Sequence, residues 1–179
     1  MEATSKKVAY VTGGSRGIGL GIAQKLVDEG YSVAISGRNA GKVKAAAATL
    51  DKGNRAALGL ISDVSNQASE NDAVRQILDR FGRLDVVVAN AGVGHFAPID
   101  QLTAEQWAET INTNLTGVFH TVKASVDALK RSEGYLITIA SLAGTNFFEN
   151  GAAYNASKFG LVGFTQAVML DLRKFGVKV

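Results

Sequence analysis

Short apolar runs alternate with longer stretches of helical periodicity along almost the whole chain. The runs are rich in valine and isoleucine and are bounded by glycines or polar residues, as is typical of buried strands. We therefore predict strands at 8–11, 32–35, 56–61, 84–89 and 135–140, with another beginning at 177–179. The predicted helices run from the glycine-rich segment after the first strand to about 28, and over 40–50, 66–81, 112–131 and 152–175, with one more beginning near Thr103.

The order of these elements predicts the fold. Strands that are apolar along their whole length are covered on both faces, and strands that alternate with helices favour a parallel sheet. We predict an α/β fold of the doubly wound Rossmann type, a three-layer single domain over 1–179 with helices on both faces of the sheet. Thr103 and Gln106 predict a capping box at the start of one helix. Because the last predicted strand begins at Val177 and the sequence stops at Val179, we expect the C-terminal strands of such a sheet to be missing.

Composition narrows the class of protein. The chain is 46% hydrophobic and 20% charged, which is typical of a globular protein, and its net charge of +3 is too small and scattered to indicate nucleic acid. It has no cysteine, and no group of histidines and carboxylates has metal-ligand spacing. No apolar run approaches the roughly 18 residues of a membrane span, and no signal peptide is evident. We expect a cytoplasmic protein that binds no metal, nucleic acid or membrane.

The segment between the first strand and the first helix is rich in glycine. It reads Thr12-Gly-Gly-Ser-Arg-Gly-Ile-Gly19, with glycines at 13, 17 and 19 in the spacing G-x-x-x-G-x-G. Gly13 permits a tight turn, Gly17 lets the backbone approach a pyrophosphate, and Gly19 lets the helix pack closely on the strand. The N–H groups at the start of the helix would then face the phosphates. A plain structural turn is the alternative, and the absence of G-K-[ST] argues against an ATPase or kinase.

Positive charge replaces the acid that most NAD-binding proteins carry after the second strand. That strand ends in Ser36-Gly-Arg38-Asn39, and Arg16 lies within the glycine turn. Two guanidinium groups can hold a 2′-phosphate, so we predict NADP(H) over NAD(H), unless both arginines are merely solvated. Asp63, after the third strand, could accept a hydrogen bond from adenine or simply cap the turn.

Three residues near the fifth strand suggest proton chemistry. Tyr154 and Lys158 are four positions apart, so they share one helix face, and Ser141 follows the strand on the side where ligands bind. A free tyrosine has a pKa of about 10, which a nearby ammonium lowers. Ser141 could bind a substrate oxygen. The alternatives are an ordinary buried tyrosine and a serine that caps the strand end.

Together these motifs resemble the short-chain dehydrogenase/reductase family over 7–179. The resemblance rests on an ordered series: the cofactor turn with Ser15, Arg16, Gly17, Ile18 and Gly19; Asp63-Val64, its adenine contact; Asn90-Ala91-Gly92, beside the cofactor; Asn114, its water-holding asparagine; and Ser141, Tyr154 and Lys158, its catalytic residues. It implies an NADP(H)-dependent oxidoreductase that interconverts a ketone or aldehyde and an alcohol. Tyr154 would be the acid/base and Lys158 its pKa modulator and ribose ligand.

The resemblance also implies a homodimer or homotetramer that pairs through the helices at 112–131 and 152–175. Members of the family continue past the position of Val179 into a substrate loop, which leaves the substrate unnamed. Phe147 and Phe148 would suit an apolar substrate or pack in the core, and His95 and Phe96 lie either at the substrate pocket or in a surface loop. One alternative function is a cofactor-binding but inactive regulatory or scaffold protein. Another is an epimerase or dehydratase, although such relatives space their glycines G-x-x-G-x-x-G.

Overall fold

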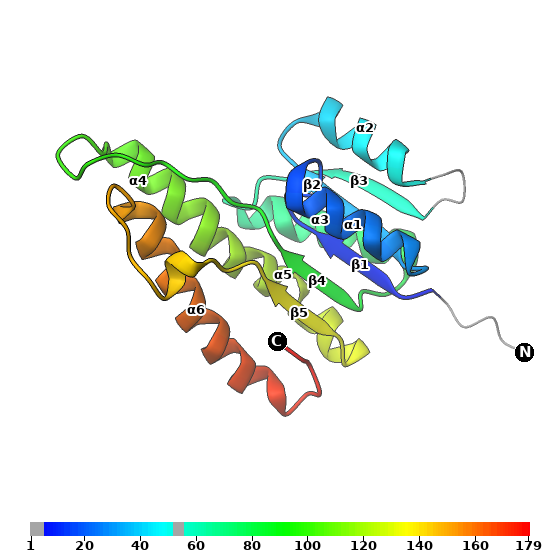
Figure 1. Cartoon of the computed structure of the whole chain (residues 1–179). Coiled ribbons are helices and arrows are strands. Elements are labelled where there is room, and N and C mark those ends of the chain that lie inside the picture. Colours follow the sequence, from blue (N-terminus) through cyan, green and yellow to red (C-terminus); the bar gives the residue numbers. More distant parts are fainter. Residues whose placement is uncertain (1–5, 52–55) are drawn as a thin grey trace, which may run out of the picture.

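A parallel sheet forms the centre of the molecule. The computed structural model describes residues 6–51 and 56–179, and within them five strands pair in the order β3-β2-β1-β4-β5 (Figure 1). Every strand pair is parallel. The strands are β1 (Val8–Val11), β2 (Ser32–Gly37), β3 (Ala57–Ile61), β4 (Val86–Ala89) and β5 (Tyr135–Thr138). The predicted Rossmann-type α/β fold is confirmed.

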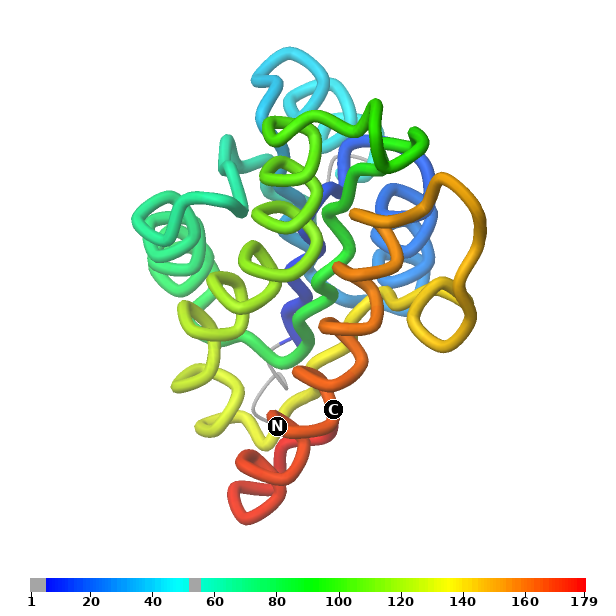
Figure 2. Tube along the Cα trace, turned by 90° about the vertical axis from the view of Figure 1, so that its left-hand side faces the viewer, coloured from blue at the N-terminus to red at the C-terminus, as the bar shows by residue number. Residues whose placement is uncertain are grey.

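Helices cover both faces of this sheet. They are α1 (Gly17–Asp28), α2 (Ala40–Asp51), α3 (Gln67–Phe81), α4 (Ala104–Ile111), α5 (Gly117–Ser132) and α6 (Ala152–Arg173). Apolar side chains of α1 and α2 pack on one face of the sheet, while those of α3, α5 and α6 pack on the other. In Figure 2, α5 and α6 run side by side across the second face. No helix in the described part of the chain is long and apolar enough to cross a membrane.

Successive residues of a strand pack into different cores, one on each face of the sheet. In β1, Tyr10 belongs to the core beneath α3 and α5, whereas Ala9 and Val11 belong to the core beneath α1 and α2. In β5 only one face is covered, because Leu136 is 2% exposed while its neighbours Tyr135 and Ile137 are 45% and 44% exposed. The predicted sixth strand is present as a single bridge, in which the Leu136 N–H donates to the Lys178 carbonyl at 2.8 Å.

The helices predicted near Thr103 and at 112–131 are in fact one continuous helical run. The capping box at Thr103 is confirmed, and α4 leads directly into a π-helical turn at Asn112–Thr116 and then into α5. The segment where they join, Asn-Thr-Asn-Leu-Thr, is polar, and such side chains often compete for backbone hydrogen bonds. Here the Asn114 amide bonds to the backbone of another segment instead, so the helix widens by one residue rather than ending.

Candidate active site

Glycine conformation shapes the turn between β1 and α1. Gly13 and Gly17 have φ angles of +64° and +55°, in the left-handed region that side chains rarely adopt. Gly19 is required for a different reason: a Cβ there would collide with the Asn90 side-chain amide and lie 2.6 Å from the Gly13 carbonyl oxygen. The start of α1 therefore lies against the turn, as the glycine spacing predicted.

Thr12 joins this turn to the segment that follows β4. Its Oγ1 accepts hydrogen bonds from the backbone N–H groups of Asn90 at 3.0 Å and Ala91 at 3.1 Å. In return, Asn90 Nδ2 donates to the Thr12 carbonyl at 2.8 Å. The side chain of Asn90 thus fixes the ends of β1 and β4 relative to each other, and Gly92 lies two residues further along this fixed segment.

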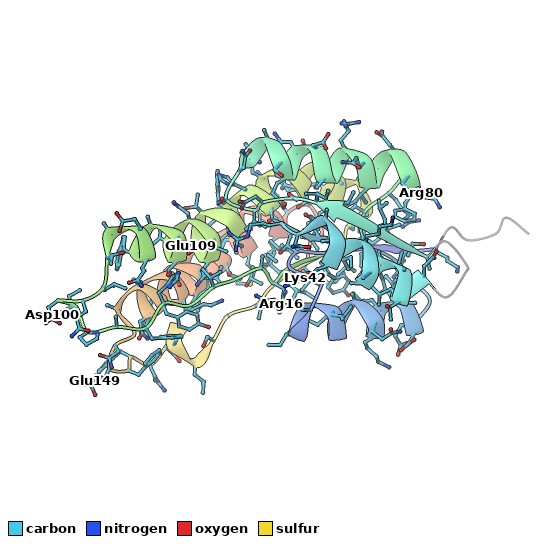
Figure 3. The ribbon with its side chains drawn as sticks, turned by 90° about the horizontal axis from the view of Figure 1, so that it is seen from above. Arg16, Lys42, Arg80, Asp100, Glu109 and Glu149 are labelled. Carbon is cyan, nitrogen blue, oxygen red and sulfur yellow. The ribbon has the colours of Figure 1, made fainter. Side chains whose placement is uncertain are left out.

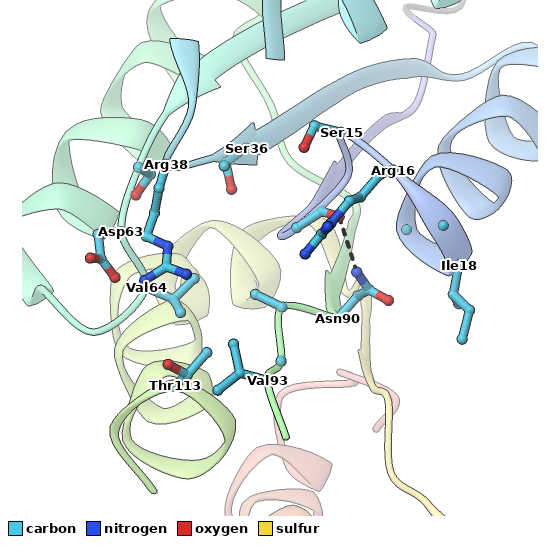
Figure 4. A pocket seen from close by; sticks show the side chains of 17 residues that line it. Ser15, Arg16, Ile18, Ser36, Arg38, Asp63, Val64, Asn90, Val93 and Thr113 are labelled. Atoms are coloured by element: carbon cyan, nitrogen blue, oxygen red, sulfur yellow. Dashed lines mark hydrogen bonds between the residues drawn. The ribbon is translucent and has the colours of Figure 1, made fainter. Parts of the chain in front are cut away.

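A cleft of about 400 Å³ opens at these strand ends (Figure 4). The N-terminus of α1 faces it, with no acidic residue in the first turn and no side-chain cap on the N-terminal N–H groups. Such a helix end favours an anion. The cleft contains the whole of the cofactor set predicted from the sequence apart from Tyr154 and Lys158: Gly13, Ser15, Arg16, Gly17, Ile18, Gly19, Arg38, Asp63, Val64, Asn90, Ala91 and Gly92.

Two cations face the cleft, and one of them has an acidic neighbour. Figure 4 shows Arg16 and Arg38 reaching into the space from different walls. Arg38 Nη1 lies 3.6 Å from Glu109 Oε1 on α4, while Glu109 Oε2 lies 2.8 Å from His95 Nε2. The hydrogen bond with His95, assisted by the charge of Arg38, lowers the pKa of the Glu109 carboxyl. Local patterns could not reveal this cluster, because its members come from three separate segments.

Asp63 has a structural task at the cleft wall. Its Oδ1 accepts from the Ser65 backbone N–H at 3.0 Å and from Ser65 Oγ at 2.7 Å, so the turn-capping interpretation holds. The same residue also lines the cleft. The next residue, Val64, is buried, and its carbonyl lies 2.8 Å from His120 Nδ1, which gives that histidine a structural role.

Tyr154 and Lys158 lie in the first turns of α6, on one face of the helix. Lys158 is 6% exposed, and its Nζ donates to the Ile139 carbonyl at 2.7 Å. This Nζ is 5.8 Å from the centre of the Tyr154 ring. Burial lowers the pKa of the Lys158 ammonium. Tyr154 is half-buried, with ring centroids 5.5 Å from Phe96 and 6.5 Å from Phe148.

Asn114 connects the cleft to α6. Its Oδ1 accepts from the Val93 N–H at 2.8 Å, and its Nδ2 donates to the Val93 carbonyl at 2.8 Å and to Ser157 Oγ at 3.1 Å. Ser157 Oγ in turn donates to the Tyr154 carbonyl at 2.8 Å. Val93 lines the cleft, and a Cβ on the adjacent Gly94 would lie 3.5 Å from Tyr154 Cδ2. The tyrosine ring therefore stands next to Gly94, one residue beyond the cleft-lining Val93.

Ser141 follows β5 and caps the short 3₁₀ turn η2 (Leu142–Gly144). Its Oγ accepts from the Ala143 N–H at 3.2 Å, so it caps this turn rather than the strand end, and the hydroxyl keeps a proton that it can donate. Asn155 Nδ2 donates to the Ala143 carbonyl at 3.0 Å, which holds this turn against the start of α6. The sequence had not singled out Asn155. Ser141, Tyr154 and Lys158 do not line the 400 Å³ cleft itself.

The aromatic side chains near the tyrosine are exposed to solvent. Phe96 and Phe148, whose rings lie against that of Tyr154, are 58% and 47% exposed, and Phe147 is 88% exposed. Packing in the core is therefore the wrong interpretation for Phe147 and Phe148. The Ala97 N–H donates to the Asn150 carbonyl at 3.0 Å and thereby joins the loop after β4 to the loop before α6. No group of histidines and carboxylates among residues 6–51 and 56–179 could hold a metal ion.

Comparison with known proteins places this geometry in a family. The sequence matches the short chain dehydrogenase family over residues 7–179. It is 35% identical over 184 residues to trans-4-hydroxycyclohexanecarboxylate dehydrogenase from Sinomonas cyclohexanicum, covering 99% of this chain and 71% of that protein.

Similarity to solved structures points to the same family. An actinorhodin polyketide ketoreductase with NADPH has a TM-score of 0.94 at 36% identity, covering 100% of this chain and 70% of its own. A short-chain dehydrogenase/reductase from Burkholderia phymatum with NAD has a TM-score of 0.92 at 28% identity, covering 99% of this chain and 65% of its own. The resemblance read from the sequence motifs is confirmed. The chain belongs to the short-chain dehydrogenase/reductase family.

Proposed function

We propose that this protein is an NADP(H)-dependent oxidoreductase that interconverts a ketone or aldehyde and an alcohol, with Tyr154 as the acid/base. The observation that carries the proposal is the position of the Tyr154 ring. The ring stands next to Gly94, one residue beyond Val93 in the wall of a cleft suited to a dinucleotide. The backbone carbonyl of Tyr154 is linked to Val93 through Ser157 and Asn114, and a buried lysine lies beside the ring. Related proteins are dehydrogenases, and similar solved structures contain NADPH or NAD.

The residues present fit a dinucleotide. The N–H groups at the start of α1, with Ser15 and Ile18, would receive the pyrophosphate, because the left-handed glycines leave the turn without side chains at the point of approach. Arg38 and Arg16 would hold a 2′-phosphate. Asp63 and Val64 would contact the adenine. The segment Asn90-Ala91-Gly92 would lie along the middle of the cofactor, and Lys158 would reach its second ribose.

The chain's own residues would manage the proton. A bound nicotinamide supplies or accepts the hydride at the carbonyl carbon. In the reducing direction, the Tyr154 hydroxyl gives its proton to the carbonyl oxygen. The Lys158 ammonium stabilises the resulting phenolate, since a positive charge nearby favours the ionised form of a tyrosine. Ser141 donates a hydrogen bond to the same substrate oxygen and stabilises its developing charge.

Asn114 would act mainly as a positioning residue. Its side-chain amide is occupied by Val93 and Ser157, so a water of the proton relay would rest on its backbone carbonyl rather than on the amide. The π-helical turn that contains Asn114 departs from the regular helical hydrogen-bond pattern, which makes such a carbonyl contact possible.

Two measurements test the proposal. NADPH oxidation against a panel of apolar ketones and aldehydes should show turnover, and Tyr154→Phe should lower kcat by at least about 100-fold while NADPH binding is retained. A fully active Tyr154→Phe variant would refute the acid/base assignment. NADPH binding without turnover of any carbonyl would instead support the cofactor-binding but inactive alternative.

We also propose that the protein is a homodimer or homotetramer that pairs through α5 and α6. A groove of about 640 Å³, lined by residues of both helices, lies between them. Phe119 on α5 is 45% exposed and Leu170 on α6 is 66% exposed. Side chains of this size on one surface favour burial against another subunit.

A further inference from the structure

The carboxylate of Glu109 stands next to the arginine assigned to the 2′-phosphate. Glu109 lies on α4, four positions before Thr113, which lines the cleft. Arg38 reaches into the cleft from the end of β2 toward the side where Val64 and Thr113 lie (Figure 4). Glu109 therefore lies beside the cleft with its carboxylate next to Arg38, whereas Arg16 extends from the start of α1 (Figure 3).

We propose that Glu109 is a specificity-determining residue, which competes with the 2′-phosphate of the dinucleotide for Arg38 and so limits the preference for NADP(H) over NAD(H). This inference rests on the proposed function. Nothing in the sequence motifs assigns a role to Glu109.

The contact between Arg38 and Glu109 is weak enough for another anion to replace Glu109. The nearest approach, 3.6 Å, is longer than a hydrogen bond, and the side chains of Arg38 and Glu109 are 62% and 42% exposed. Ion pairs of this kind contribute little to stability, so Arg38 can leave without disturbing the fold. A phosphate carries more charge than a carboxylate and offers several oxygens to a guanidinium, and it is therefore the stronger partner.

Glu109 is held in place independently of Arg38. Its second oxygen lies 2.8 Å from His95 Nε2, a normal hydrogen-bond distance, and the hydrogen bond keeps the pKa of the carboxyl below its usual range. When Arg38 turns to a phosphate, Glu109 therefore remains nearby and ionised. Its charge offsets part of the positive potential of Arg38 and repels the phosphate, whereas a dinucleotide without the 2′-phosphate is unaffected.

The test compares dissociation constants measured by isothermal titration calorimetry. We expect Glu109→Gln to bind NADPH about two- to five-fold more tightly than wild type, as suits an exposed charge pair, and to bind NADH equally well. The glutamine keeps the length of the side chain and can still hydrogen-bond His95. The gain should shrink at high salt, because an exposed interaction is screened.

Glu105→Gln is the matched control, because it removes the same charge from the same helix one turn earlier. It should leave both affinities at the wild-type value. An equal gain in Glu105→Gln would mean that net charge alone is responsible and would overturn the proposal, as would unchanged or weaker NADPH binding in Glu109→Gln.

Arg38→Ala separates this inference from the proposed function. If Arg38→Ala weakens NADPH no more than NADH, the NADP(H) assignment itself fails. If that loss is specific for NADPH but Glu109→Gln changes nothing, only the competition fails. Competition also predicts that Glu109→Gln gives a smaller gain in an Arg38→Ala background than in wild type. An equal gain in both backgrounds would show that Glu109 acts without Arg38 and would refute the mechanism.

Discussion

Replacing Asn114 with alanine should destabilise the fold and disturb the cleft at the same time. Asn114 is 1% exposed and makes three hydrogen bonds, two with the Val93 backbone and one with Ser157. The alanine variant would leave the Val93 N–H and carbonyl without these partners. It would also free the loop that carries Val93 along the cleft and Gly94 beside Tyr154.

The magnitude follows from these contacts. A hydrogen bond contributes about 0.5–1.5 kcal/mol net, and a buried group left without a partner costs about 1–3 kcal/mol. Ser157 loses only an acceptor role, because its hydroxyl still donates to Tyr154. Val93 is half-buried, so water replaces part of its loss. We therefore expect the free energy of unfolding to fall by about 2–4 kcal/mol, within the total of about 5–15 kcal/mol for a typical domain.

Urea unfolding, followed by the fluorescence of Trp107, measures this effect. Trp107 is the single tryptophan of the chain and lies on α4, in the same continuous helical run as Asn114. With an m-value of about 2 kcal/mol per molar urea, the midpoint should fall by about 1–2 M. Asn112→Ala is the control, because Asn112 belongs to the same π-helical turn but is exposed. An Asn114→Ala midpoint equal to that of Asn112→Ala would refute the argument.

Three further predictions concern the turn, the lysine and the subunit surface. Gly19→Ala should abolish NADPH binding in calorimetry, because the added Cβ would lie 2.6 Å from the Gly13 carbonyl oxygen; Gly21→Ala, whose Cβ meets nothing within 4 Å, should bind normally, and equal binding by both would contradict the close-packing argument. Burial lowers the pKa of Lys158, so the unfolded chain binds this proton more strongly and the charge subtracts from stability until the pH rises to about 10.5. Lys158→Met should therefore lose activity, and its stability relative to wild type, measured by urea unfolding, should decline from neutral pH toward 10.5; a flat difference would contradict the assigned shift. Phe119→Asp, on a side chain 45% exposed on α5, should shift the species seen by light scattering toward the monomer, whereas an unchanged oligomer would place the interface elsewhere.

Local sequence was sufficient where the determining interaction lies within one element. Apolar runs predicted each strand of the sheet, and the glycine spacing predicted where α1 begins. Tyr154 and Lys158 share a helix face because of helical periodicity alone. Nothing in the local pattern at Glu70, however, predicts that this residue is buried. It is fully buried and accepts hydrogen bonds from Tyr10, Ser62 and Thr121, which come from separate elements.

Only the tertiary structure could decide which distant residues meet. In the π-helical turn, the Val93 backbone holds Asn114 from another segment, so a pattern read along the helix alone could not show that the two predicted helices join. Glu109 gained its neighbours in the same way, since Arg38, His95 and Glu109 lie on different segments and are brought together by the order of the parallel strands. Periodicity records which side of an element faces the core, whereas a polar contact requires two elements to be placed within about 3 Å of each other. That placement is set by packing over the whole sheet, and no single stretch of the chain encodes it.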